Sequence, residues 1–284
     1  MSSKPVLPFV ETMITQSCNI SCLGCTNYSD LKHSGYVSWV DGKQQIEAWL
    51  DRIEIPDFGI MGGEPLINPE VKDWILGTRE LLPTSQIRFT TNGLLLAKHY
   101  DIIDLMSFVG NCVFKITVHY NTEELENLID QIKFSYNWET VIEHGITRFK
   151  TDNNFRFQIN YPTKFIKTYK NTYNNMMPYN SDPVNAFDNC CQQTCPLLYN
   201  GRIYKCSTAG LLGETLKRFN NPNWDSWKHY VVDGITPTCS DDSLNEFIKN
   251  FGNPHAICGQ CPTEKQGTII HLENIGQKNA QTYF

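Results

Sequence analysis

The sequence lacks a secretion signal, a long apolar run and any run of lysine or arginine. Residues 1–9 contain one lysine and no apolar core followed by small residues, so they do not resemble a secretory signal. No later apolar run has the length of a transmembrane helix. The formal net charge of -6 disfavours a nucleic acid or an anionic membrane surface as the main partner. These absences predict a cytoplasmic protein whose main partner is neither a nucleic acid nor a membrane.

Cysteine is the residue type that the sequence has in excess, with 11 among 284 residues. In a reducing compartment, clustered cysteines are more often metal ligands or redox groups than disulfides. The first three are Cys18, Cys22 and Cys25, and seven more fall between Cys190 and Cys261. The composition, 40% hydrophobic and 19% charged, is that of an ordinary globular protein. The length and this distribution predict two unequal domains, each with a cysteine centre.

Strand-like and helix-like segments alternate through the first half of the chain. We expect strands at residues 6–15, 58–61, 86–91, 113–119 and 155–160, and helices at residues 44–53, 71–82, 97–108 and 122–132. Strands that alternate with helices form a parallel sheet, here predicted to be a partial barrel. Active sites in such folds lie beyond the carboxyl ends of the strands. The first cysteine cluster and the turns at residues 62–65 and 90–93 all follow predicted strands, so we expect them to lie together.

The first cluster reads Cys18-Asn-Ile-Ser-Cys22-Leu-Gly-Cys25. Three thiols on one short loop suit three corners of a cubane iron–sulfur cluster, whose fourth iron then needs a different ligand. The alternative is a structural zinc site, for which nearby His33 would supply the fourth ligand.

This spacing resembles the CxxxCxxC signature of the radical S-adenosylmethionine (SAM) superfamily, and the resemblance extends over residues 6–161. It implies a (β/α)6 TIM-like partial barrel with a [4Fe-4S] cluster whose open iron is chelated by SAM. It also implies a one-electron donor such as flavodoxin or ferredoxin. Reductive cleavage of SAM in this family gives a 5′-deoxyadenosyl radical, which abstracts a hydrogen atom from the substrate.

Other parts of the first half resemble the SAM-binding positions of that family. Gly62-Gly63-Glu64-Pro65 is similar to the motif that holds the ammonium group of SAM, although a Gly-Gly pair alone more often marks a turn. On the same resemblance we expect Asn92, Thr117 and His119 near SAM, although Asn92-Gly93 is equally well interpreted as an ordinary turn and His119 as a core histidine. Gln158 and Asn160 share one face of the next predicted strand, and we expect their amides near the adenine or ribose. The chain departs from the family at Gly24, where an aromatic residue is common, so Tyr28 or a later residue would have to pack on the adenine.

The second cysteine set contains a predicted hairpin between Cys195 and Cys206, with its turn at Asn200-Gly201, and a later Cys258-x-x-Cys261 pair. The region resembles the twitch domain, a shortened relative of the SPASM domain that follows many radical SAM barrels. The resemblance implies one auxiliary [4Fe-4S] cluster, whose ligands would be Cys191 or Cys195 together with Cys206, Cys258 and Cys261. A zinc ribbon would use the same thiolates. Cys112 is expected in the core.

The predicted organisation is a barrel at residues 1–165, a linker or cap at 166–188 and an auxiliary cluster domain at 189–284. The predicted function is that of a radical SAM oxidoreductase or peptide maturase, acting on a small molecule or a peptide. Since the first strand starts near Val6, we expect no leader-binding domain before the barrel. A non-catalytic iron–sulfur or zinc protein is the alternative, and the turn at residues 62–65 counts against it.

Overall fold

One mixed sheet runs through the protein. The computed structural model describes residues 4–31, 33–135, 139–143, 146–150, 154–162, 165–266 and 269–270. Within these residues nine strands form the sheet, in the order β10-β9-β1-β2-β3-β4-β7-β6-β5. Their bounds are β1 Phe9–Met13, β2 Asp57–Met61, β3 Gln86–Thr91, β4 Cys112–Thr117, β5 Glu139–Glu143, β6 Ile146–Lys150, β7 Arg156–Asn160, β9 Leu197–Tyr199 and β10 Arg202–Tyr204. The six strands from β9 to β7 are parallel, which confirms the predicted α/β class.

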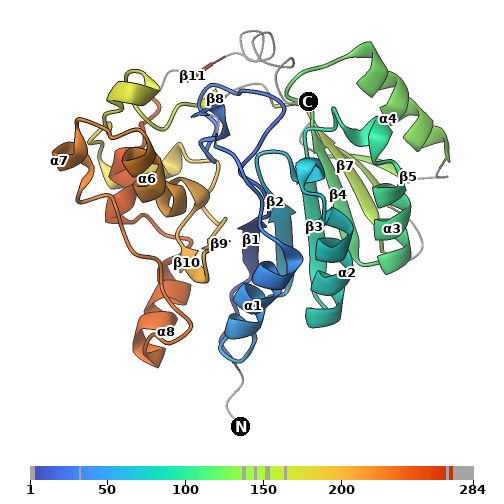
Figure 1. Ribbon diagram of the computed structural model, residues 1–284, viewed down its shortest axis with the longest axis horizontal. Coiled ribbons are helices and arrows are strands. Elements are labelled where there is room, and N and C mark those ends of the chain that lie inside the picture. Colours follow the sequence, from blue (N-terminus) through green and yellow to red (C-terminus); the bar gives the residue numbers. More distant parts are fainter. Residues whose placement is uncertain are drawn as a thin grey trace.

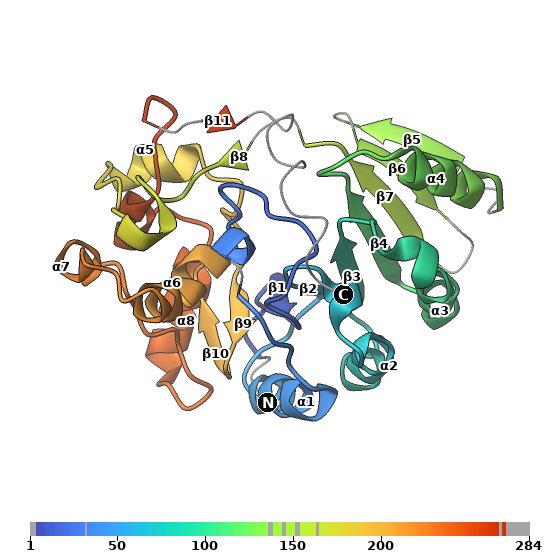
Figure 2. The same ribbon diagram turned by 45° about the horizontal axis from the view of Figure 1, so that its top comes forward.

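Four helices follow the first four strands in turn and cover the outer face of the sheet (Figures 1 and 2). They are α1 Trp39–Leu50, α2 Val71–Leu81, α3 Asp101–Val109 and α4 Glu123–Ser135. The core between these layers contains alternate strand residues, among them Val10, Phe58, Phe89 and Phe114. The side chains that alternate with these face the other side of the sheet. That inner face carries polar residues, and it leads to the strand ends.

Two helix starts differ from those expected. α1 begins at Trp39, five residues earlier than predicted, because the Ser38 side chain accepts a hydrogen bond from the Asp41 backbone N–H and caps the helix. α3 begins at Asp101 instead of residue 97, since Leu96–Lys98 form a short 3-10 turn. The antiparallel hairpin of β5 and β6 between α4 and β7 was not predicted.

The second half of the chain completes the same sheet and builds a second core. The predicted hairpin is confirmed as β9 and β10, with Asn200 and Gly201 both at positive φ in its turn. β9 pairs in parallel with β1, so the sheet crosses the predicted domain boundary. The remaining elements are β8 Phe165–Ile166, paired with β11 Ile269–Ile270, and the helices α5 Pro183–Asp188, α6 Ser207–Arg218, α7 Trp224–Trp227 and α8 Asp241–Asn250.

The second core contains residues of both halves: Met13 and Tyr28 pack with Leu197, Leu212 and other residues of the C-terminal half. The division into domains at residues 165 and 189 stays a prediction. In the part of the chain that the structure describes, no helix has the length and apolarity needed to cross a membrane.

Candidate functional site: a cysteine-lined pocket at the strand ends

The three clustered thiols lie in the loop between β1 and α1, at the carboxyl ends of the parallel strands (Figure 1). Cys18, Cys22 and Cys25 all line one pocket. Burial raises the pKa of the Cys25 thiol to about 11 and raises the pKa values of Cys18 and Cys22 well above the ordinary value. The charge of Cys25 adds to the rise in the pKa values of Cys18 and Cys22, and Cys18 and Cys25 both pack against the small cluster of Ile20 and Cys22. Thiols in this setting stay protonated until a metal centre displaces their protons.

The glycine turn packs directly against the start of this loop. The Gly63 backbone N–H donates to the Thr15 carbonyl at 2.8 Å, and the Glu64 N–H donates to the Ser17 carbonyl at 2.8 Å. A Cβ atom on Gly63 would lie 2.3 Å from the Ser17 carbonyl oxygen, so only glycine permits this approach. The turn thus fixes the backbone immediately before Cys18.

Glu64 joins this turn to the next strand end. Its carboxylate accepts hydrogen bonds from the Thr91 hydroxyl at 2.7 Å, from the Asn92 N–H at 2.8 Å and from the Leu66 N–H at 3.1 Å. The side chain is fully buried, and this burial raises the pKa of Glu64 to about 7. Besides the predicted role in SAM binding, Glu64 therefore has a structural role that the sequence did not indicate: it holds two strand-end turns together.

The side chain of Asn92 reaches the cysteine loop. Its amide donates to the Asn19 side-chain oxygen at 2.7 Å, and the same nitrogen lies 3.9 Å from the Cys18 sulfur. Asn27, on the other side of the loop, donates to the Gly62 carbonyl at 3.1 Å. Asn19 and Asn27 were missed by the sequence analysis, since asparagine in a loop carries no signal beyond a turn preference.

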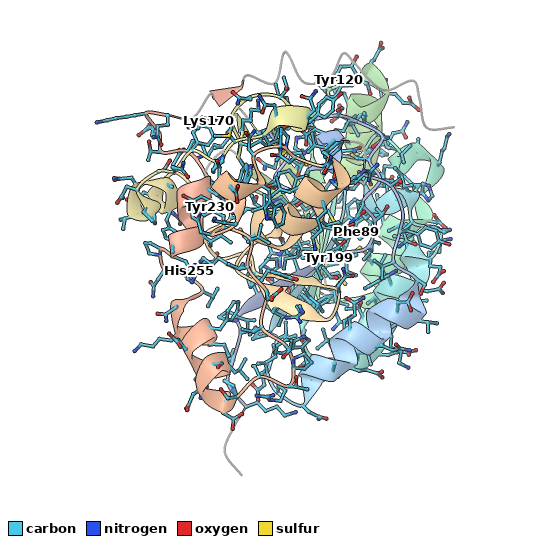
Figure 3. All side chains as sticks on the ribbon, turned by 60° about the vertical axis from the view of Figure 1, so that its left-hand side comes forward. Phe89, Tyr120, Lys170, Tyr199, Tyr230 and His255 are labelled. Carbon is cyan, nitrogen blue, oxygen red and sulfur yellow. The ribbon has the colours of Figure 1, made fainter. Side chains whose placement is uncertain are left out.

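Of the other polar residues predicted to lie near SAM, two line the pocket and two do not. Thr117 and His119, at the end of β4, belong to its wall. Burial lowers the pKa of His119 to about 4, so its imidazole is neutral at pH 7. Tyr120, the next residue, is labelled at the upper end of the molecule in Figure 3. Gln158 and Asn160 lie on β7, beyond β4, and are not among the residues of the wall.

The residues considered for adenine packing and for zinc binding have other surroundings. Tyr28 is fully buried; this burial raises its pKa, and the charges of Cys261 and Cys206 of the second cysteine set raise it further. Gly24 has φ +83°, and a Cβ there would lie 3.0 Å from the Lys167 Cα, which explains why an aromatic residue is absent. Both ring nitrogens of His33 contact α6, through Thr215 and Arg218 at 3.1 Å each.

The second cysteine set separates into two groups. Cys190, Cys206, Cys258 and Cys261 are linked by the effects of their charges on one another's pKa values, and the charge of Cys191 acts on Cys190 and Cys261 as well. Burial is the main cause that raises the pKa of Cys206 to about 12, and the charges of Cys190 and Cys258 raise it as well. The pKa of Cys261 is raised by burial and then by Cys206, Cys190 and Cys258. We call these four thiols the second thiol group. The group includes Cys190, whereas the sequence analysis expected Cys191 or Cys195 in that place.

The other cysteines lie outside this group. The pKa of Cys195 is raised first by burial and then by Glu11 of β1, which places this thiol toward the sheet. Cys239 is half-buried against the outer core, and Cys112 is buried there, as expected. Among the described residues, no three His, Cys, Asp or Glu side chains are arranged to hold a single metal ion. A cubane bonds each thiolate to a different iron and does not require such convergence.

The two cysteine sets are joined by hydrogen bonds around Thr26, which follows Cys25. The Thr26 carbonyl accepts from the Thr208 hydroxyl at 3.1 Å, and its hydroxyl accepts from the Gln192 side chain at 3.2 Å. The Gln192 N–H in turn donates to the Cys190 sulfur at 3.2 Å. The first loop is therefore built against the second thiol group.

The fold and these contacts define an α/β protein with a cysteine-lined pocket at the carboxyl ends of parallel strands. Residues 12–147 match the model of the radical SAM superfamily, so this part of the chain is a radical SAM domain, as the cysteine spacing predicted.

Two kinds of similar protein accompany the family match. The chain is 33% identical over 98 residues to a GTP 3',8-cyclase of Mycobacterium sp. (strain KMS) and 32% identical over 89 residues to one of Rhodopirellula baltica. These matches cover 31% and 30% of this chain but only 26% and 25% of the relatives. A crystal structure of BtrN in complex with AdoMet and 2-DOIA has a similar fold, with a TM-score of 0.51 and 14% identity over 96% of this chain and 100% of that one.

Proposed function

We propose that the chain is a radical SAM enzyme that holds a [4Fe-4S] cluster on Cys18, Cys22 and Cys25 and binds SAM in the adjoining pocket. The observation that carries the proposal is that three buried thiols, the Gly62-Gly63 turn, Asn92, Thr117 and His119 surround one pocket. The thiols fit the cluster because all three line the same pocket, and glycine at positions 62 and 63 lets the turn pack against the backbone that precedes Cys18. The bound cluster would supply the electron that cleaves SAM.

The chain's own residues would bind, orient and shield these groups. The Gly62 carbonyl, oriented by Asn27, would accept a hydrogen bond from the SAM ammonium, while Glu64 keeps the turn in place. Asn92 would hold the loop around Cys18 through Asn19. His119 is neutral and so would act as a hydrogen-bonding group beside SAM without repelling its sulfonium charge.

The second thiol group would bind an auxiliary [4Fe-4S] cluster. Its four cysteines match the ligand number of a cubane, and all are shielded from full solvent exposure. The net reaction would be an oxidation or a crosslink, on a small molecule or a peptide, with a flavodoxin- or ferredoxin-type electron donor. The relatives are named for a cyclase activity on GTP, but the match covers only 26% of the first of them, so it supports no particular substrate.

The test is to measure iron, sulfide and zinc in anaerobically reconstituted protein and then 5′-deoxyadenosine after adding dithionite and SAM. We expect about eight irons per chain, four for each cubane, together with deoxyadenosine. A loaded protein that forms no deoxyadenosine would favour the non-catalytic alternative. About four irons with bound zinc would make the second thiol group a zinc site.

The ligand set of the second thiol group is tested separately. Replacing Cys190 by alanine should remove up to four irons per chain, because one of the four ligands is lost. Replacing Cys195 by alanine is the matched control and should leave the iron content unchanged. If the Cys195 variant loses the iron and the Cys190 variant keeps it, the assignment of Cys190 is wrong.

A further inference from the structure

A second group of polar side chains lies on the inner face of the sheet, below the pocket. Since side chains alternate along a strand, Lys115 shares a face with Thr117 of the pocket wall and lies roughly 7 Å further from the strand end. Glu11 of β1 pairs with Gly59 of β2, two residues before Met61, which also lines the pocket. The group of Glu11 and Lys115 therefore lies directly beneath the place proposed for SAM.

Glu11 is a buried acid without a complete set of partners. Its side chain belongs to a residue only 8% exposed, and its Oε1 atom has no hydrogen-bond partner within the described part of the chain. Opposite it, a Cβ on Gly59 would come within 3.0 Å of the Glu11 Cβ, so glycine leaves room for the carboxyl group. Buried polar atoms in folded proteins are normally paired, so this oxygen requires a partner such as a water molecule or a ligand group.

The charges around Glu11 are nearly balanced. Arg88 faces it from β3 but forms an ion pair with Asp57, and Lys115 faces it from β4. Lys115 forms no ion pair with a carboxylate of the residues that the structure describes. Burial raises the pKa of Glu11 to about 8 despite these cations, so at neutral pH its carboxyl group both donates and accepts hydrogen bonds.

Two thiols complete the group from the other side. Cys191 and Cys195 lie near enough for Glu11 to raise their pKa values and for Lys115 to lower them. Cys191 is exposed, so the group opens to solvent on this side. Cys190, the neighbour of Cys191, belongs to the second thiol group. The space beside Glu11 is thus flanked by the SAM pocket and by the auxiliary cysteines.

We propose that Glu11, Lys115, Cys191 and Cys195 form the substrate site, and that it takes a small molecule bearing hydroxyl groups and no ammonium group. The inference rests on the proposed function, because SAM in the adjoining pocket is what makes this space a substrate site. A hydroxyl group can donate to the unpaired Glu11 oxygen and accept from the Lys115 ammonium. An ammonium group would be repelled by Lys115.

Equilibrium dialysis tests the site. Reconstituted protein with SAM is dialysed against an equimolar mixture of monosaccharides, sugar alcohols, cyclitols, amino acids and tripeptides, and mass spectrometry measures each compound on both sides. We expect hydroxyl-bearing members to be enriched with the wild type at least about fivefold, consistent with binding through paired polar contacts. Glu11→Ala and Lys115→Met should abolish the enrichment and leave SAM retention unchanged. Glu54→Gln, which changes an exposed carboxyl group, is the control and should behave as wild type.

Each other outcome overturns the inference. Enrichment of amino acids or tripeptides would show that the proposed ligand class is wrong. Enrichment that persists in both variants would show that the binding site lies elsewhere in the protein. No enrichment of any compound would exclude a preformed small-molecule site. The same preparations are assayed for deoxyadenosine. A protein that retains hydroxyl-bearing compounds but forms no deoxyadenosine would contradict the proposed function alone.

Discussion

Replacing Cys18, Cys22 and Cys25 together by alanine will abolish deoxyadenosine formation and lower the iron content from about eight to about four per chain. The reason is that the pocket has these thiols as its only cysteines among the described residues, so nothing else there can hold a cluster. Iron and sulfide analysis and a deoxyadenosine assay with dithionite and SAM measure both effects. The second thiol group lies on other elements and should keep its iron.

The control for this variant is Cys239→Ala, because Cys239 is half-buried against the outer core and belongs neither to the first cysteine cluster nor to the second thiol group. It should retain all the iron and the full activity. Deoxyadenosine formation that persists in the triple variant would show that the radical chemistry does not originate in this pocket. An iron-free triple variant that carries zinc would instead contradict the auxiliary iron–sulfur cluster.

Replacing Gly63 by alanine should be nearly as damaging, although it removes no ligand. The added Cβ would lie 2.3 Å from the Ser17 carbonyl oxygen and 2.9 Å from the Cys18 Cβ. The Ser17 carbonyl oxygen is a backbone atom and cannot be displaced by a side-chain rotation. The loop must therefore move, and Cys18 moves with it. We expect deoxyadenosine formation to fall by roughly 100-fold or more, since a displacement near 1 Å costs about that factor. We also expect the melting temperature to fall by several degrees, because forced overpacking costs about 1–3 kcal/mol.

Gly252→Ala is the matched control for that change, since a Cβ there meets its nearest atom, on Thr194, only at 3.8 Å. It should preserve iron content, melting temperature and activity. Near-normal iron content and activity in the Gly63 variant would mean that the loop before Cys18 is free to adjust. The contact between the glycine turn and this loop would then not be required to position Cys18.

Much of the first half follows from sequence periodicity. The strands β2, β3 and β4 and the helix α2 begin and end close to the predicted residues, because apolar residues recur there with the spacing of each element. α6 was missed for a physical reason: Gly210 and Gly213 weaken its intrinsic helix propensity, and packing of Leu211, Leu212 and Leu216 in the second core compensates. Such tertiary compensation has no local signature.

The site was predictable where spacing carries information and not where contacts arise from folding. The first three cysteines and the glycine turn stand at recognisable spacings, and the structure brings them together in one pocket. The choice among Cys190, Cys191 and Cys195 depends on which way a short turned segment faces, which spacing does not encode. Glu11 did carry a signal that was overlooked, since a charged residue in the middle of an otherwise apolar buried strand requires a reason.

The pairing of β1 with both β2 and β9 has a consequence for electron transfer. β1 leads into the first cysteine loop, and β9 follows the segment that contains Cys190, so backbone hydrogen bonds connect the supports of the two sets. The Glu11 N–H donates directly to the Pro196 carbonyl at 3.0 Å. The gap that an electron would have to tunnel across is therefore set by the register of a sheet. Its rate would be a fixed property of the fold, insensitive to the opening and closing of loops around the substrate.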